Sequence, residues 1–173
     1  MCSSALGSVT NARASLRFER VQVTHAGLLT ELFERNARPE VTSSFDPFPL
    51  DRKEARRIAL ESHRDGYYVA ARADSLVGFS MLRGFDEGYE IPSFGIFVDH
   101  DAHGQGVGRA LTAWTIEAAR RRGCPSVRLS AYANSAVALG LYASMGFVER
   151  ERLVINRAAG PEEKIVMCLR LNS

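Results

Sequence analysis

The sequence predicts one α/β domain with a single mixed, mostly antiparallel sheet flanked by helices. Three observations favour this class. A length of 173 residues fits one domain. Runs that alternate apolar and polar residues, as strands do, are interspersed with runs of helical periodicity. Most strand-like runs are joined by short turns, whereas one glycine-rich loop leads from a strand into a helix.

The chain shows no internal repeat and no linker rich enough in Pro, Gly or Ser to divide it. Residues 1–15 are small and polar and are expected to form a loose tail. Residues 16–173 are therefore expected to form the single domain.

Composition excludes several classes of protein. With 46% apolar and 24% charged residues, the chain has the balance of a globular domain, and a net charge of +2 gives no general attraction to nucleic acid. No apolar run approaches the roughly 18 residues of a membrane span, and the N-terminus lacks the apolar stretch of a secretory signal. We therefore expect a cytoplasmic protein with no membrane or nucleic-acid partner. Cys2, Cys124 and Cys168 are too far apart for a metal knuckle and too few for a disulfide framework.

The first half of the domain should contain a strand, two helices and a hairpin. Thr24 is a good N-cap residue for the first helix, and Asn36 can end it. Asp51 and Glu54 stand three residues apart before the second helix, a variant of the capping box. The expected elements are a strand at 16–23, a helix from about 24 to 36, a proline-rich loop at 38–50, a helix from about 51 to 62, and a hairpin of strands 67–72 and 76–85.

The second half centres on the clearest helix, residues 107–122. Its apolar residues share one face, three arginines occupy its last turn, and Gly123 ends it. The strand before it contains Pro92, which requires an edge position or a bulge. Asn134 or Ser135 can cap the last helix. The expected elements are strands at 90–98, 127–132, 147–155 and 164–171, and helices at 107–122 and from 134 or 135 to 144.

The most informative stretch is the loop that opens this helix, His-Gly-Gln-Gly-Val-Gly-Arg-Ala at residues 103–110. Backbone N–H groups at a helix N-terminus are unpaired and attract anions, and glycines let a phosphate approach them closely. The dinucleotide pattern fails because Arg109 or Leu111 stands where its third glycine belongs, and no Gly-Lys-Ser/Thr follows as in a Walker loop. The loop therefore predicts a phosphate site of another type, unless it is merely a glycine-rich turn that starts a helix.

This loop resembles the acyl-CoA pyrophosphate motif of the GNAT superfamily of N-acetyltransferases, which reads Arg or Gln, two residues, Gly, one residue, then Gly or Ala. Gly106 and Gly108 match the glycines, whereas His103 replaces the usual Arg or Gln. A second segment, from Asn134 to Tyr142 and followed by Met-Gly-Phe, also has the order and spacing that the family shows. The two motifs cover about residues 90–150, and the flanking elements fit the family's order.

The resemblance implies a GNAT-like fold that uses acetyl-CoA as a co-substrate and no metal. The backbone of Phe97 and Val98 should pair with the pantetheine arm, as an added strand would. Asn134 should hydrogen-bond the cofactor. A homodimer is common in the family. The residues expected to hold the pyrophosphate are His103, Gly104, Gln105, Gly106, Val107, Gly108 and Arg109.

Acetyl transfer to an amine needs a base for the amine and a proton donor for the departing thiolate. Tyr142 stands where the family places a tyrosine and is the expected donor, although it could also be a core aromatic. Glu90, at the start of the strand expected to receive pantetheine, is the expected base. Asp86, Glu87 and Tyr89 are close alternatives.

The acceptor is expected to be a small-molecule primary amine. In the family it usually lies between the loop joining the first two helices and the strand ends opposite the cofactor. Aromatics and carboxylates together suit a cationic amine, and the run around Met81 and Glu90 resembles members associated with bacterial polysaccharide genes, which favours an amino sugar. Two alternatives remain: a domain that binds acyl-CoA without turnover, and an acetyltransferase of protein amines. The candidate acceptor residues are Phe45, Phe48, Phe85, Glu87 and Tyr89.

Overall fold

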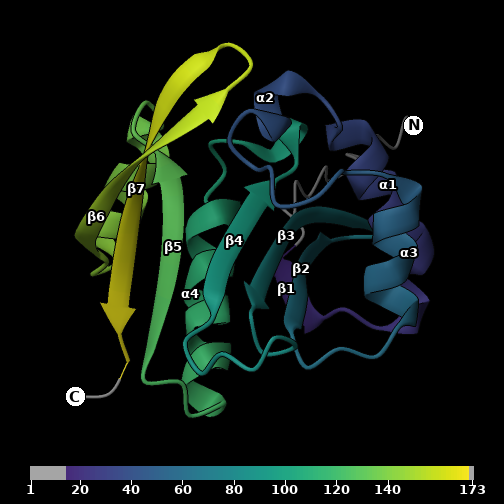
Figure 1. Cartoon of the computed structure of the whole chain (residues 1–173). Coiled ribbons are helices and arrows are strands. Elements are labelled where there is room, and N and C mark those ends of the chain that lie inside the picture. Colours follow the sequence, from purple (N-terminus) through teal and green to yellow (C-terminus); the bar gives the residue numbers. More distant parts are fainter. Residues whose placement is uncertain (1–14, 172–173) are drawn as a thin grey trace, which may run out of the picture.

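The computed structural model describes residues 15–171 and shows one seven-stranded sheet (Figure 1). The strand order is β1-β2-β3-β4-β5-β7-β6, and all neighbours are antiparallel except β4 and β5, which run parallel. The predicted fold class is confirmed. The strands are β1 (Leu16–Arg20), β2 (Gly66–Arg72), β3 (Ser75–Arg83), β4 (Ser93–Val98), β5 (Ser126–Tyr132), β6 (Val148–Arg157) and β7 (Gly160–Arg170).

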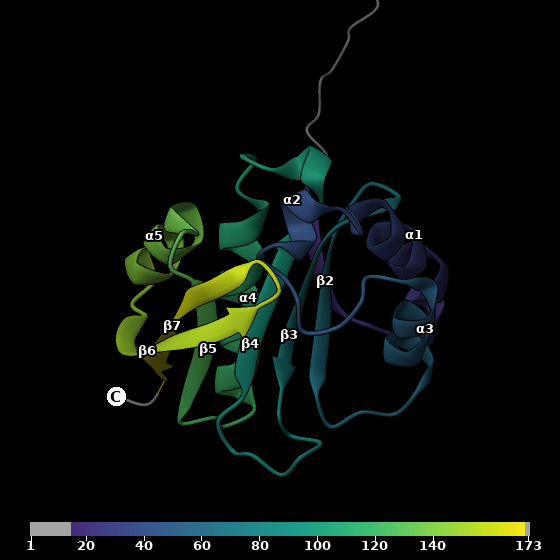
Figure 2. The same cartoon turned by 45° about the horizontal axis from the view of Figure 1, so that its top comes forward.

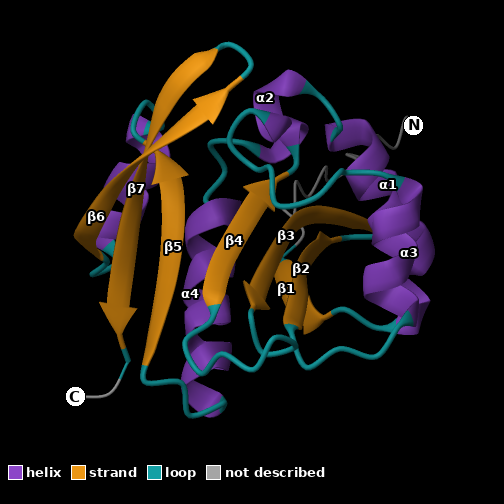
Figure 3. Ribbon diagram, in the orientation of Figure 1, coloured by secondary structure: helices purple, strands orange, loops and turns teal. Residues whose placement is uncertain are grey.

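Helices cover both faces of this sheet (Figures 2 and 3). On one face, α1 and α3 enclose an aromatic core in which Phe33 meets Phe79 and Phe97. On the other face, α4 buries Leu111 and Ile116, and α5 lies near β7. The helices are α1 (Ala26–Asn36), α2 (Pro39–Thr42), α3 (Arg52–Leu60), α4 (Val107–Arg121) and α5 (Ala136–Ser144), with 3₁₀ turns at Val23–His25 and His100–Ala102.

The strand that leads to the glycine loop is shorter than predicted. It begins at Ser93 rather than at residue 90, so Glu90 lies in an irregular segment before it. Pro92 therefore needs neither an edge position nor a bulge, although β4 is a central strand, because the ladder begins after the proline. The carbonyl oxygen of Pro92 still accepts a hydrogen bond from the N–H of Arg128.

Other differences lie at element ends. Thr24 is not the cap of the first helix, because a 3₁₀ turn over Val23–His25 precedes α1. Within the expected loop at 38–50, Pro39 starts the short helix α2, a position where its missing N–H costs nothing. Asp51 caps α3 as predicted, accepting the N–H of Glu54 at 2.8 Å.

The tail expected at residues 1–15 lies outside the described residues except for Ser15. Across residues 15–171, none of the helices has the length and apolar character that crossing a membrane requires.

Candidate active site

The parallel strands β4 and β5 are joined at one point and then separate. Their register contains a single pair, Ser93 with Arg128, beside the hydrogen bond from the Arg128 N–H to the Pro92 carbonyl oxygen at 3.1 Å. From there the strands diverge toward their C-terminal ends (Figure 1). The β5-facing edge of β4 is therefore left unpaired beyond Ser93.

Strand alternation decides which peptide groups lie on this open edge. The Pro92 carbonyl points to β5, whereas the N–H of Asp99 donates to the Val77 carbonyl oxygen on β3 at 2.9 Å. Because peptide groups alternate in direction along a strand, those of Ile96 and Val98 face the gap. Those of Phe97 face β3, and its side chain is buried in the aromatic core. The expected pantetheine contact therefore fits Val98 and does not fit Phe97, since β3 already uses its peptide groups.

The glycine loop stands at the wide end of the split. Gly104 and Gly106 have φ angles of +70° and +79°, which favour glycine, and a Cβ at either position would meet open space. Gly106 is the N-cap of α4, so the N–H groups of residues 107–109 have no partner within the helix. A pyrophosphate fits this positive, uncrowded helix end.

Side chains of the same loop are tied to neighbouring elements. Arg109 donates to the Ser144 hydroxyl at 2.8 Å, which joins the start of α4 to α5. Gln105 accepts a hydrogen bond from Arg72. His103 is exposed, and its Nε2 lies 3.0 Å from the carbonyl oxygen of Val98. At this position the imidazole thus covers a carbonyl that the open edge of β4 would otherwise offer.

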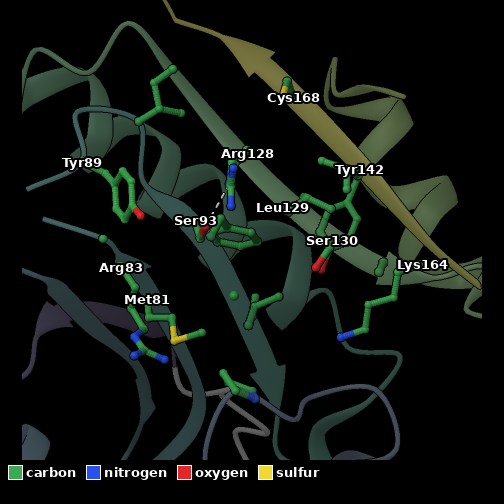
Figure 4. Close-up of a pocket in the computed structure, with 18 of the residues that line it drawn as sticks. Met81, Arg83, Tyr89, Ser93, Arg128, Leu129, Ser130, Tyr142, Lys164 and Cys168 are labelled. Carbon is green, nitrogen blue, oxygen red and sulfur yellow. Dashed lines mark hydrogen bonds between the residues drawn. The ribbon is translucent and has the colours of Figure 1, made fainter. Parts of the chain in front are cut away.

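A cleft of about 1390 Å³ occupies the narrow end of the split (Figure 4). Residues 93–96 of β4 and 128–131 of β5 line it, together with the loop after α2, Gly84, the segment 87–91 and the β6–β7 hairpin. Residues 103–109 do not line it. The phosphate-type loop and the cleft therefore lie at the two ends of one split.

Tyr142 enters the cleft from α5 (Figure 4). Its ring packs against Phe94 and Phe147, and the residue is only 8% exposed. Burial raises the pKa of its hydroxyl to about 12. The phenol therefore keeps its proton throughout the physiological range, as a proton donor must.

The predicted base has a less defined setting. Glu90 is exposed and lines the cleft, as do Glu87 and Tyr89 from the same segment. Asp86 does not line it. Its carboxylate accepts the backbone N–H of Arg64 at 2.7 Å, and that hydrogen bond holds its pKa below the ordinary range. Asp86 thus supports the segment, whereas Glu87 and Glu90 are free to meet an acceptor.

The predicted acceptor residues separate into two groups. Phe45, Glu87 and Tyr89 line the cleft. Phe48 packs on the aromatic core beneath it and lies outside the lining. Phe85 is wrong as an acceptor residue, because it is buried in the core on the other face, with the Arg122 guanidinium 3.8 Å from its ring centre.

Asn134 also lies outside the lining of the cleft. It is exposed in the turn after β5, whereas its neighbour Ser135 lines the cleft and is the N-cap residue of α5. The expected cofactor contact of Asn134 remains a prediction.

Several polar cleft residues escaped the sequence analysis. Arg128 and Ser130 alternate with buried Val127 and Leu129 on β5. This alternation of polar and apolar residues could have indicated that the two polar side chains share the open face of the strand. Their neighbours across the sheet come from distant parts of the chain and have no local signature. The other polar residues of the cleft that escaped it include Ser44, Arg83, Ser93, Ser126, Glu151 and Lys164.

A polar strap joins the loop after α2 to the β6–β7 hairpin. The Asp46 carboxylate accepts hydrogen bonds from the Tyr132 hydroxyl at 2.5 Å, from Arg157, and from Lys164 at 3.4 Å. Partial burial raises the pKa of Asp46, but the Tyr132 hydrogen bond and the two cations outweigh it and leave the pKa lowered. Asp46 is therefore a charged structural anchor rather than a base.

The strand order, the split parallel pair and the glycine loop define the acyl-CoA N-acyltransferase fold. Comparison with known proteins agrees: residues 29–147 match the model of the acetyltransferase (GNAT) family. The chain belongs to this family.

Two curated relatives match over part of their length. A ribosomal protein bS18-alanine N-acetyltransferase of Escherichia coli K12 is 38% identical over 82 residues, which are 46% of this chain and 55% of that protein. A mycothiol acetyltransferase of Thermobispora bispora is 36% identical over 87 residues, which are 47% of this chain and 30% of that protein. The match thus spans about half or less of these relatives.

Solved structures agree over nearly the whole chain. The E. coli ribosomal-protein-S18-alanine N-acetyltransferase superposes with a TM-score of 0.71 at 22% identity, covering 92% of this chain and 96% of that one. A Salmonella typhimurium protein described as an acetyltransferase, solved with acetyl-CoA, gives a TM-score of 0.72 at 19% identity, with 91% and 94% covered. At these identities the likeness establishes the fold alone.

Proposed function

We propose that this protein transfers the acetyl group of acetyl-CoA to a primary amine by direct attack in a ternary complex. One observation carries the proposal: the only parallel pair of strands among residues 15–171 opens between the free N-terminus of α4 and a cleft whose wall contains Tyr142.

The split suits an extended cofactor. The free peptide groups of Ile96 and the N–H of Val98 can pair with the amides of a pantetheine arm, as in strand addition, whereas the Val98 carbonyl is covered by His103. The N–H groups of residues 107–109 can hold the pyrophosphate, with Gly104 and Gly106 allowing close approach. The thioester would then lie in the narrow part of the split, beside Phe94 and Tyr142.

The cleft supplies groups for both proton transfers. An alkyl amine with a pKa near 10.4 is only about 0.04% neutral at pH 7, and only the neutral form attacks. Glu90 or Glu87, directly or through a water, would take the proton from the amine. The new C–N bond forms as the C–S bond breaks, and Tyr142 donates its proton to the departing thiolate. A covalent acetyl-enzyme is not needed, and burial raises the pKa of the Cys124 thiol, which makes it a poor nucleophile.

The acceptor is proposed to be a small-molecule amine, with an amino sugar among the candidates. The cleft combines Phe45 and Tyr89 with carboxylates, which suits a cationic body. A protein N-terminus is the second candidate, because the E. coli relative is named for the alanine of a ribosomal protein.

A thermal-shift titration tests cofactor binding. Acetyl-CoA at one hundred times its Kd should stabilise the fold by about 2.7 kcal/mol, a rise in Tm of roughly 5–11 °C, whereas NADH should not. Gly106→Ala and Gly123→Ala form a matched pair, because these glycines bound the same helix with φ of +79° and +76° and open space around both. Each should lower stability by about 1–2 kcal/mol, but only Gly106→Ala should weaken acetyl-CoA binding.

Thiol release with an amine panel then tests turnover. Acetylation of small amines would support the proposal, and acetylation confined to peptide N-termini would favour the second candidate. Acetyl-CoA binding with no thiol release from any amine would favour a binding domain without turnover. No shift with millimolar acetyl-CoA would refute the cofactor assignment itself.

A further inference from the structure

Three polar side chains form a row across the floor of the cleft. Arg83 on β3 pairs in register with Ser93 on β4, which pairs in turn with Arg128 on β5. Residues in register on adjacent strands project from the same face, and strands lie about 4.8 Å apart, so the two arginine Cα atoms are about 10 Å apart. All three line the cleft (Figure 4).

Arg128 is fixed on one side and free on the other. Its Nε donates to the Ser93 hydroxyl at 3.2 Å. Within residues 15–171 its two terminal nitrogens make no hydrogen bond, and no carboxylate lies within ion-pair distance. A guanidinium held by its Nε presents a planar pair of donors to the cleft, which matches the geometry of a carboxylate or a phosphate.

Arg83 adds a second positive charge that is only weakly compensated. Its Nε is buried and has no hydrogen-bond partner among the described residues. The nearest carboxylate oxygen, of Asp65, is 3.9 Å away. The other oxygen of Asp65 already accepts the N–H groups of residues 84–86. The guanidinium of Arg83 therefore remains a cation at the cleft wall, 5.7 Å from the ring centre of Phe48.

The remaining charges of the cleft are arranged differently. Lys164, the third cation in the lining, is neutralised by Asp46 in the strap. Glu87 and Glu90, on the exposed segment before β4, have no ion-pair partner within the part of the chain described. The positive charge of Arg128 is thus unpaired and that of Arg83 is only weakly compensated on the floor of the cleft, whereas the carboxylates of Glu87 and Glu90 lie on the loop beside it and that of Glu151 lies on β6.

We infer that the acceptor is an amine that also carries an oxyanion, either a carboxylate or a phosphate, which Arg128 binds with help from the charge of Arg83. This inference rests on the proposed function and specifies its substrate class. The ammonium of such an acceptor would face Glu87 and Glu90, and its oxyanion would face the arginine row. An amine without an oxyanion would leave Arg128 without a partner.

Matched acceptors test the inference by thiol release. The pairs are 4-aminobutyrate with butylamine, and glucosamine 6-phosphate with glucosamine, which separate carboxylate from phosphate. The wild type should show a higher kcat/KM for the anionic member of at least one pair. Arg128→Gln should lower that kcat/KM about 10-fold to 100-fold, mainly by raising KM. It should change kcat/KM for the member without an oxyanion by less than about 3-fold.

Two further variants refine the assignment. Arg83→Gln should cause a smaller loss, about 3-fold to 10-fold, because it acts through charge rather than contact. Arg150→Gln is the control, since Arg150 is an exposed arginine of β6 outside the cleft. The inference would be overturned if the wild type turned over the members without an oxyanion as well as or better than the anionic members. It would also be overturned if Arg128→Gln kept the wild-type preference for the anionic members. Either result would leave the proposed function intact.

A binding measurement decides the matter if none of these amines is acetylated. The side-chain Nε–H resonance of Arg128, assigned by its loss in Arg128→Gln, should shift saturably when acetate or inorganic phosphate is added to the CoA-bound protein. Sodium chloride at the same ionic strength should not reproduce the shift. Absence of a saturable shift, or an equal shift with chloride, would refute the anion site whatever the outcome for turnover.

Discussion

Replacing Tyr142 by Phe should separate catalysis from folding. The ring packs between Phe94 and Phe147, and Phe preserves both contacts. The hydroxyl has no protein hydrogen-bond partner among the described residues, so its removal should change the free energy of unfolding by less than about 1 kcal/mol. If that hydroxyl protonates the departing thiolate, kcat for thiol release should fall about 10²-fold to 10⁴-fold, with little change in KM for acetyl-CoA.

The control is Tyr68→Phe, which removes the hydroxyl of another tyrosine that is 4% exposed and does not line the cleft. Its kcat should equal that of the wild type. A kcat of Tyr142→Phe within about 3-fold of the wild type would refute the donor role, and the tyrosine would then be a packing residue.

The same residue makes a prediction about alkaline stability. The pKa of Tyr142 is about 12 in the folded protein, against an ordinary value of 10.0. Because the folded pKa is raised, the contribution to stability is complete below pH 10 and is lost as the pH rises to 12. Two pKa units correspond to about 3 kcal/mol. Chemical denaturation from pH 9 to 12 should therefore show a fall in the free energy of unfolding of the wild type. In Tyr142→Phe this fall should be smaller by about 3 kcal/mol. If the free energies of the two proteins fell in parallel with pH, the buried, desolvated setting of Tyr142 would be contradicted.

Further predictions concern the cleft and the segment that Asp65 supports beside it. Asp65→Ala leaves the N–H groups of residues 84–86 without their buried acceptor and should lower stability by about 3 kcal/mol, or about 6–12 °C in Tm by calorimetry; an unchanged Tm would contradict this. Asp46→Asn removes the anchor of the strap and should raise KM for the amine more than KM for acetyl-CoA in steady-state assays, and an equal effect on both would argue against a strap over the acceptor. Because the pKa of Asp46 is lowered, its stabilising effect should be present above pH 4 and fade below it, a dependence that acid denaturation of Asp46→Asn should lack. Glu90→Gln and Glu87→Gln should identify the base: the correct one removes the ascending limb of the kcat/KM–pH profile, and two unchanged profiles would exclude both.

The sequence predicted the parts of the site that depend on local patterns. The glycine loop needs a strand before it, a helix after it and positive φ at two glycines, and all three conditions are visible within residues 90–122. The start of β4 was misplaced because alternation continues through Pro92, whereas the ladder itself begins only at Ser93. Because of that error of three residues, Glu90 was assigned to a strand, although it lies in a loop.

The acceptor side could not be predicted in the same way, because its residues meet only through the order of strands in the sheet. Phe85 illustrates this limit. It follows β3 closely in sequence and seemed to face the acceptor, but the chain turns at Gly84 and buries it on the α4 face. Nothing in the local pattern states to which face a residue beyond a strand end will turn.

The match to the family model does not reach all of the residues that line the cleft. The family match ends at residue 147, whereas one wall of the cleft is built by β6 and β7, from Glu151 to Cys168. The contacts proposed for a pantetheine arm and a pyrophosphate use mainly backbone groups, which many sequences can supply. The proposed acceptor site, in contrast, is lined by side chains such as Arg83 and Arg128, and each substitution there changes the charge that an acceptor must complement. Acceptor identity should therefore follow the side chains of the arginine row and the hairpin rather than the fold, and acceptor assays on variants of these residues will reveal more than further comparison of the glycine loop.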